Sequence, residues 1–302
     1  MIMSKSMEII EHREVYMNQN AIVKAEILSQ ALPYIQKYHD KIVVIKYGGN
    51  AMINEELKMN VINDVVLLSE IGVKVILVHG GGPAINETLH KIGKEAKFID
   101  GLRYTDEETI DVVQMVLAGK TNKDLVKLIM QKGGNAVGIS GVDNKLIVAK
   151  KHVAEHDLGY VGDVDKINPN IIFDMLEKGY IPVIASVGTD DEGHTYNINA
   201  DTAAAEIAGA LGAENMILVS DIPGLLQDKD DDSSLIPLVH VYEVKGLMDK
   251  GIISGGMIPK IDCCVRAIRQ NVKKAVIIDG RIPHSILIEM LSTDGIGTMF
   301  QR

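Results

Sequence analysis

Short apolar runs rich in β-branched residues recur along the chain, separated by stretches with helical periodicity. The runs lie at residues 42–45, 73–78, 136–139, 181–185, 216–219 and 275–278. Because successive positions are apolar, each run suits a strand that is buried on both faces. Such strands, alternating with helices, form a mainly parallel sheet covered on either side. The pattern therefore predicts an α/β fold, a three-layer αβα sandwich with a mainly parallel central sheet.

The N-terminal segment has a different pattern. Within residues 7–36, Leu28, Ala31, Leu32 and Ile35 follow the i, i+3, i+4, i+7 spacing of an amphipathic helix. A helix of that length would extend about 45 Å at 1.5 Å per residue, which is more than packing within one domain requires. We therefore expect its first half to pack against another subunit. A locally packed terminal helix is the alternative.

Three shorter stretches predict local features. Between Lys145 and Asp165, short alternating pieces with turn residues predict hairpins over one edge of the sheet. The acidic residues 228–232 predict a solvated loop. Cys263 and Cys264 are adjacent in a segment with helical periodicity, so they point roughly 100° apart and do not converge on one metal ion. We expect them to be core thiols in a reducing compartment.

Composition narrows the class of protein. The 302 residues, 46% of them hydrophobic, suffice for one large α/β domain or two lobes. A net charge of −10 without a basic tail argues against a nucleic-acid partner. The N-terminus lacks the apolar core of a signal peptide, and no apolar run approaches the roughly 20 residues that span a membrane. We expect a soluble, cytoplasmic protein.

Glycines gather where the predicted strands end. Lys-Tyr-Gly-Gly at 46–49 follows the first strand, and His-Gly-Gly-Gly-Pro at 79–83 follows the second. Glycine at the carboxyl end of a strand lets backbone N–H groups approach a ligand, and a following helix N-terminus favours an anion. Ligands of open α/β sheets bind at this edge. Residues 220–225 and 254–256 form two further loops of this kind, so we expect phosphate or carboxylate binding here.

Residues 196–205 place polar side chains at the start of an alanine-rich helix. Asn and Asp are common N-terminal helix residues, and that ordinary role would suffice for Asp201. A buried carboxylate between Lys46 and Lys260 would instead orient both lysines and keep them charged. Arg103, just before a predicted helix, could bind a carboxylate bidentately, with a surface ion pair as the alternative.

Two common nucleotide motifs are absent. Ala-Gly-Lys-Thr at 118–121 resembles the end of a Walker loop, but residue 114 is glutamine rather than the required glycine. The glycines at 80–82 lack the third glycine of a dinucleotide motif. Phosphoryl transfer by positioning and charge neutralisation remains, for which two lysines, glycine-loop N–H groups and Mg²⁺ are suitable. We expect Lys46 and Lys260 to take this role.

Taken together, the motifs resemble the amino acid kinase family from about residue 41 to residue 300. The most specific segments are 46–49, 78–83, 100–105, 197–201, 218–221 and 255–260. The chain is most similar to the members that phosphorylate N-acetyl-L-glutamate. The resemblance implies a helical extension at residues 1–38 and a kinase domain at 39–302. In that domain, residues 39–195 would bind acetylglutamate and residues 196–302 would bind ATP.

The resemblance also implies an activity: ATP-dependent phosphorylation of the side-chain carboxylate of N-acetyl-L-glutamate, the second step of arginine biosynthesis. By this resemblance, Lys46 and Lys260 would stabilise the transition state, and Asp201 would hold both lysines in place. The substrate would be bound by Gly81, Gly82, Arg103 and Asn197. ATP, carrying its own Mg²⁺, would be bound by Gly48, Gly49, Ser220, Asp221, Gly224, Leu225, Ser254, Gly255 and Gly256. The acceptor carboxylate is already ionised and requires no general base, so His79 is expected to be structural.

The N-terminal helix and the last residues resemble the arginine-sensitive branch of that family, in which the extra helix interlaces dimers into a hexamer. The resemblance implies a feedback site for L-arginine formed by Tyr16, His284, Glu289 and Gly295. For Glu289 the alternative is an ordinary exposed helix residue. Docking of a PII-type regulator is left open. Two alternative functions are also left open: a kinase for glutamate, aspartate, carbamate or UMP, and an arginine sensor without turnover.

Overall fold

An eight-stranded sheet forms the centre of the protein. The computed structural model describes residues 2–52, 54–293 and 295–302. Across the sheet the order is β12-β14-β13-β11-β1-β2-β8-β5. The six strands from β13 to β5 are parallel, and β14 is antiparallel to β13. These six are the runs predicted as strands: β1 (Ile42–Tyr47), β2 (Lys74–His79), β5 (Ala136–Ser140), β8 (Ile181–Ala185), β11 (Asn215–Ser220) and β13 (Lys274–Asp279). The other two are β12 (Leu238–His240) and β14 (Thr298–Gln301).

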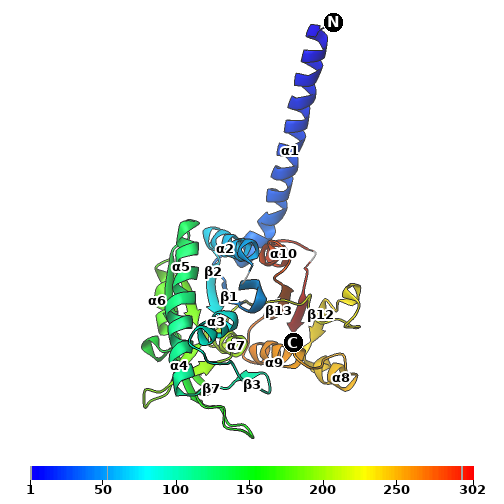
Figure 1. Ribbon diagram of the computed structural model, residues 1–302. Coiled ribbons are helices and arrows are strands. Elements are labelled where there is room, and N and C mark those ends of the chain that lie inside the picture. Colours follow the sequence, from blue (N-terminus) through cyan, green and yellow to red (C-terminus); the bar gives the residue numbers. More distant parts are fainter. Residues whose placement is uncertain (1, 53, 294) are drawn as a thin grey trace.

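Helices cover both faces of this sheet (Figure 1). The α-helices of the described residues are α1 (Ile2–Tyr38), α2 (Glu55–Glu70), α3 (Gly82–Lys91), α4 (Glu107–Gln114), α5 (Asn122–Gln131), α6 (Asn170–Glu177), α7 (Ala200–Leu211), α8 (Val244–Asp249), α9 (Met257–Arg269) and α10 (Ser285–Leu291), of which α1 projects away from the sheet. A π-helical segment, Met115–Thr121, joins α4 to α5. The Walker-like residues 118–121 therefore lie within a helical segment, as their local pattern predicted.

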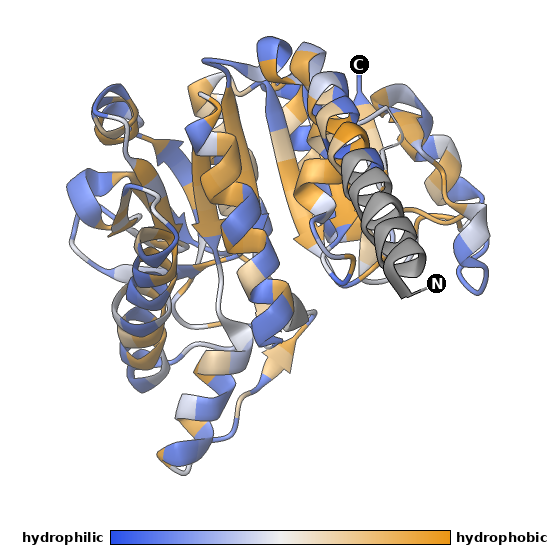
Figure 2. Ribbon diagram, turned by 90° about the horizontal axis from the view of Figure 1, so that it is seen from above, coloured by the Kyte–Doolittle hydropathy of each residue, from blue (hydrophilic) through white to orange (hydrophobic). Residues whose placement is uncertain are grey.

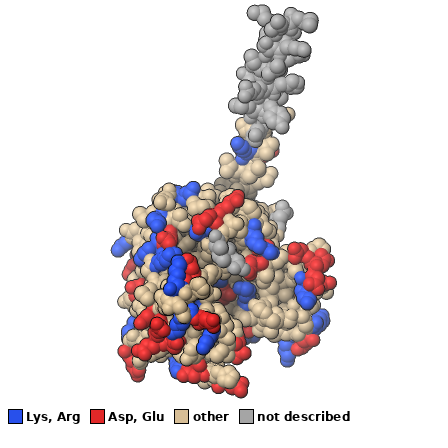
Figure 3. Space-filling model, in the orientation of Figure 1, with Lys and Arg blue, Asp and Glu red and all other residues tan. Residues whose placement is uncertain are grey.

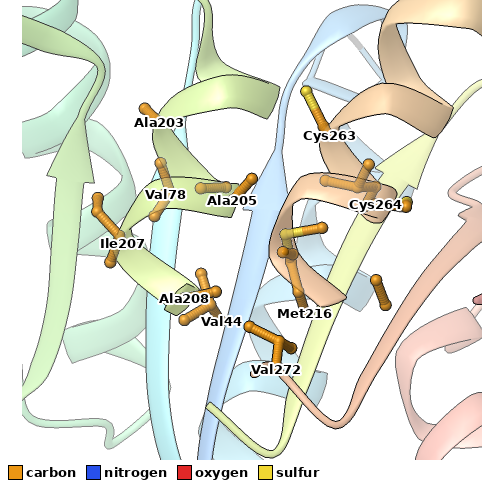
Figure 4. Packing of buried hydrophobic residues seen from close by; sticks show 14 of the residues in the cluster. Val44, Val78, Ala203, Ala205, Ile207, Ala208, Met216, Cys263, Cys264 and Val272 are labelled. Carbon is orange, nitrogen blue, oxygen red and sulfur yellow. The ribbon is translucent and has the colours of Figure 1, made fainter. Parts of the chain in front are cut away.

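The core is divided between the two faces of the sheet. On β1, Val44 packs toward α7 and α9, whereas Val43 and Ile45 pack toward α2, α5 and α10. The hydrophobic residues accordingly concentrate on the central strands (Figure 2). Small residues of α7, such as Ala205 and Ala208, let that helix lie close to Val44 (Figure 4). The αβα sandwich predicted from the apolar runs is confirmed.

Smaller elements lie beside the main sheet. A small closed barrel is formed by β6 (Ile147–Lys151), β7 (Val161–Ile167), β9 (Val187–Thr189) and β10 (Thr195–Ile198), in the order β10-β7-β6-β9. Strands β6 and β7 pair antiparallel, which confirms the hairpin predicted in this region. A two-stranded hairpin is formed by β3 (Phe98–Ile99) and β4 (Leu102–Arg103). The acidic residues 228–232 are exposed, as predicted.

Helix α1 extends from the body of the protein (Figure 1). At its foot, Tyr38 is buried and accepts a hydrogen bond from Nδ2 of Asn215 at 3.3 Å. The predicted helix is confirmed and is longer than residues 7–36. The apolar side chains on its outer part are more than half exposed: Ile22, Val23, Ile27, Leu28 and Leu32. The expected packing against another subunit stays a prediction.

The length and hydropathy of the helices and the charges on one face of the molecule can be compared with the sequence analysis. Among the described residues, no helix combines the length and the apolar character needed to cross a bilayer. On the face shown in Figure 3, lysine and arginine are interspersed with aspartate and glutamate. Charges of both signs thus alternate over this face, without the broad basic area that nucleic-acid binding requires.

His79, the last residue of β2, is a structural residue. Its ring is fully buried, with Nδ1 at 2.9 Å from the Gly80 carbonyl oxygen. Nδ2 of Asn122 lies 3.1 Å from Nε2, which makes Nε2 the acceptor and Nδ1 the protonated nitrogen. Burial is the main cause that lowers the pKa of His79 to about 4. The ring is therefore neutral in the folded protein, as its expected structural role requires.

This burial makes stability depend on pH. The unfolded state takes up a proton at His79 near pH 6.5, and the folded state does so only near pH 4. The contribution of the neutral His79 to the free energy of unfolding is thus complete above pH 6.5. It falls by about 3 kcal/mol as the pH decreases toward 4. The pKa of the buried Asp64 is shifted in the opposite direction, because burial raises it to about 6. The effect of His79 is therefore isolated by comparing two proteins that both contain Asp64. We therefore expect the difference in unfolding free energy between the wild type and His79→Gln, measured by urea denaturation, to shrink between pH 7 and pH 4. A constant difference would contradict this.

Candidate active site

The N-terminus of α7 carries the central carboxylate of the site. Asn199 caps this helix, because its side-chain oxygen accepts hydrogen bonds from the backbone N–H groups of Asp201 and Thr202. Asp201 therefore lies in the first turn, where the helix dipole favours a negative charge. The cap belongs to Asn199, so the side chain of Asp201 is free to point away from the helix end.

Asp201 binds two lysines that come from distant segments. Nζ of Lys46, in β1, lies 2.8 Å from Oδ1, and Nζ of Lys260, in the first turn of α9, lies 3.2 Å from Oδ2. Burial alone would raise the pKa of Asp201, but the lysines outweigh it, Lys46 more strongly than Lys260, and lower that pKa to about 2. The carboxylate is therefore ionised at neutral pH. The structure brings together the three residues predicted to be catalytic.

A cavity of about 250 Å³ opens beside this cluster. It contains Lys46 and Asp201 and all four residues predicted to bind the acceptor substrate, namely Gly81, Gly82, Arg103 and Asn197. Gly48 and Gly49, predicted to bind ATP, also line it. The lining thus includes a lysine ammonium group and a guanidinium group. Such a cavity suits a small molecule with two negative charges.

Arg103 is the second cationic group of the cavity. It is buried, and its Nη2 donates a long hydrogen bond of 3.3 Å to the carbonyl oxygen of Gly82. The ring of Phe98, across the β3–β4 hairpin, lies 4.8 Å from Cζ. The buried Nη1 of Arg103 has no hydrogen-bond partner among the described residues. Desolvation lowers the pKa of the guanidinium from its ordinary value, yet arginine stays charged at neutral pH. A bound carboxylate would satisfy the unpaired donor.

The glycine loop after β2 lies directly against the π-helical segment. A Cβ atom on Gly81 would lie 2.6 Å from Cδ2 of Leu117, so no larger residue fits without movement. Helix α3 begins at Gly82, and its free N–H groups attract an anion. Leu117 and Ser186 also line the cavity, although the sequence analysis did not name them. No local signal marks Leu117, because its role depends on the π-helical geometry.

The remaining residues predicted to bind ATP lie outside this cavity, at the carboxyl end of β11 and before α9. Ser220 ends β11, and residues 254–256 form an exposed loop that leads into α9. The side chain of Leu225 is buried in the core, and its backbone N–H donates to Oγ1 of Thr298 at 2.8 Å. At Gly224, φ is +138°, and a Cβ atom would lie 2.6 Å from the same Oγ1. Only the backbone of these two residues could face a nucleotide, and their role stays a prediction.

Three of the four residues predicted to bind arginine, His284, Glu289 and Gly295, lie around α10. Nδ1 of His284 is 2.6 Å from Oδ1 of Asp64 on α2. Glu289 accepts a 3.0 Å hydrogen bond from the backbone N–H of Ile296, and burial raises its pKa. A Cβ atom on Gly295 would lie 3.2 Å from Oε2 of Glu289. Glu289 is therefore not an ordinary exposed helix residue. The side chain of Tyr16, on α1, is outside the described part of the chain.

Known proteins match almost the whole length of this chain. The chain is 55% identical over 283 residues to an acetylglutamate kinase of Clostridium kluyveri, which covers 94% of this chain and 99% of that protein. It is 56% identical over 279 residues to an acetylglutamate kinase of Brachyspira hyodysenteriae, covering 92% of this chain and 97% of that protein.

Solved structures share the fold. An N-acetylglutamate synthase from Neisseria gonorrhoeae superimposes with a TM-score of 0.80 at 22% identity over 92% of this chain, which spans only 63% of that longer protein. A carbamate kinase from Giardia lamblia gives a TM-score of 0.61 at 16% identity, covering 87% of this chain and 98% of that protein. The amino acid kinase family itself matches residues 41–279. The chain belongs to the amino acid kinase family.

Proposed function

We propose that this chain transfers the γ-phosphoryl group of ATP to the side-chain carboxylate of N-acetyl-L-glutamate, which gives an acyl phosphate and ADP. The observation that carries the proposal is the ionised Asp201, which binds Lys46 and Lys260 beside a cavity that is also lined by Arg103, whose Nη1 has no hydrogen-bond partner among the described residues. The identity of 55% to an acetylglutamate kinase supports the choice of acceptor. The reaction is expected in the cytoplasm.

The proposed mechanism needs positive charge rather than a base. The acceptor carboxylate is ionised at neutral pH and attacks the γ-phosphorus directly. Lys46 and Lys260 stabilise the negative charge that spreads over the transferred oxygens, and Mg²⁺ carried by ATP neutralises the remaining phosphates. Asp201 holds both ammonium groups in position through its two ion pairs. His79 takes no part, because its ring is buried and hydrogen-bonded to Gly80 and Asn122.

The rest of the cavity would bind the acceptor. Arg103 and Asn197, which line the cavity, would bind the α-carboxylate and acetylamino groups. The N–H groups of Gly81 and Gly82, at the start of α3, would bind the attacking carboxylate. Free glutamate carries an additional ammonium group, which this cavity would bring close to Arg103. The charge repulsion favours an acceptor whose amine is acylated. ATP would bind beyond Lys260, at residues 220–225 and 254–256.

Regulation by L-arginine and assembly into a hexamer are the finer parts of the proposal. The foot of α1 contacts α10, which carries Glu289 and follows His284. A cationic ligand there would pair with the half-buried carboxylate of Glu289. The exposed apolar side chains of α1 would pack against a neighbouring dimer, and a PII-type protein remains a further candidate partner. An arginine sensor without turnover is less favoured, because the two lysines and Asp201 are assembled.

The direct test is ADP release with Mg-ATP and each of three acceptors. We expect turnover with N-acetyl-L-glutamate, and turnover at least about a hundredfold lower with glutamate and aspartate, because an uncompensated charge in a buried site costs several kcal/mol. A phosphorylated product trapped with hydroxylamine would identify the acyl phosphate. Equal turnover with free glutamate would contradict the proposed acceptor, and no turnover with any of the three would contradict the proposed activity.

Substitution of a catalytic lysine tests the mechanism. In Lys46→Ala we expect kcat to fall about a hundredfold to a thousandfold, because a preorganised charge at the transferred group is removed. Lys150→Ala is the matched control, since Lys150 is an exposed lysine paired with Asp165 on the surface. Its kcat should equal that of the wild type. The mechanism is wrong if both variants retain full kcat.

Removal of residues 1–24 tests the regulatory proposal. We expect the truncated protein to lose inhibition by L-arginine and to have a lower mass in light scattering, because both the effector site and the dimer contacts would involve α1. Turnover without arginine reports whether the kinase domain is intact. If inhibition and mass are both unchanged, α1 has neither role.

A further inference from the structure

Thr105 connects two polar residues that line the cavity, Arg103 and Asn197. Its hydroxyl group is fully buried and donates a 2.8 Å hydrogen bond to the backbone carbonyl of Arg103. The same oxygen accepts a 3.3 Å hydrogen bond from Nδ2 of Asn197. A hydroxyl has one hydrogen and two lone pairs, so it can make both bonds at once. One oxygen atom thus joins β4 to β10, which are far apart in the sequence.

The backbone of Thr105 is held independently of this hydroxyl. Its N–H donates to the carbonyl of Leu158 at 3.0 Å, and its carbonyl accepts from the N–H of Tyr160 at 2.6 Å. The backbone of Asn197 is held in the same way, because its N–H donates to the carbonyl of Tyr160 at 2.8 Å. A Cβ atom on Gly159, where φ is +72°, would lie 2.2 Å from the Thr105 carbonyl oxygen. Removal of the hydroxyl alone should therefore leave the fold in place.

The hydroxyl has a direct effect on both cavity residues. The hydroxyl fixes the orientation of the Asn197 side-chain amide, because one hydrogen of that amide is bonded to Oγ1 of Thr105. For Arg103 it fixes the backbone carbonyl, while Phe98 packs on the guanidinium from the opposite strand of the hairpin. The cavity does not include Thr105 itself. Its influence on a ligand is exerted through the two neighbours that line the cavity.

We propose that Thr105 is a positioning residue for the acceptor: its hydroxyl holds Arg103 and Asn197 at the separation that the acetylated amino acid requires. The proposal rests on the proposed function and adds a residue to it. Because the hydroxyl of Thr105 bonds to the two residues assigned to the acceptor, it should set the affinity for the acceptor and leave the phosphoryl-transfer step unchanged.

The test compares Thr105→Val with Thr105→Ser and Thr109→Val. Valine matches threonine in shape and lacks the hydroxyl. The carbonyl of Arg103 and the side-chain amide of Asn197 therefore both lose their hydrogen bond to Thr105. We expect the KM for N-acetyl-L-glutamate to rise about tenfold in Thr105→Val, while kcat and the KM for ATP stay within about twofold of the wild type. Thr105→Ser keeps the hydroxyl and should restore the KM.

Thr109→Val is the matched control for stability. Thr109 is also buried, on α4 nearby, but its hydrogen-bond partner is Asp106 rather than a residue of this cavity. We expect a lower melting temperature in Thr109→Val without a change of KM. Equal KM values in Thr105→Val and the wild type would overturn the proposal, as would a raised KM that serine does not restore. An inactive wild type would instead refute the proposed function, and this proposal with it.

Discussion

The ionised carboxylate of Asp201 is the interaction on which the rest of the site depends. It is buried between the ammonium groups of Lys46 and Lys260, and removal of one partner from a buried ion pair costs about 3 to 5 kcal/mol. Each lysine alone would be a strand-end or helix-end charge. Held by Asp201, the two become a fixed pair of cations at the edge of a cavity. The glycine loops and Arg103 are useful for phosphoryl transfer only around that pair.

Packing between α7 and α9 keeps this arrangement in place. Below the Asp201–Lys260 contact, Oγ1 of Thr202 lies 3.7 Å from Sγ of Cys263. Further along, Glu206 accepts from Nη1 of Arg266 at 2.9 Å and from Nε2 of Gln270 at 2.7 Å. These contacts follow one face of each helix, so α9 cannot rotate without breaking several of them. Lys260 is therefore positioned by the whole length of two helices as well as by its own ion pair.

Much of this could be predicted from the sequence, because the signals are local. Six apolar runs gave the six parallel strands, and Asp201, Lys46 and Lys260 stood out beside helix starts and glycine turns. Contacts made only in the folded protein could not be predicted. Leu117 reaches Gly81 because its helix has a π-helical turn, and Thr105 joins Arg103 to Asn197 across two strands. The exposure of the outer apolar residues of α1 was likewise visible only in the structure.

The most direct measurement is the ionisation of Asp201 in protein labelled with ¹³C at the aspartate carboxyl carbons, with the signal assigned by its loss in Asp201→Asn. The account predicts that Asp201 keeps the chemical shift of the ionised form down to about pH 3, since its pKa of about 2 lies well below the ordinary value of 3.8. In Lys46→Met the midpoint should move upward. A wild-type midpoint at or above 3.8 would contradict the account, because the two lysines would then not hold an ionised carboxylate between them.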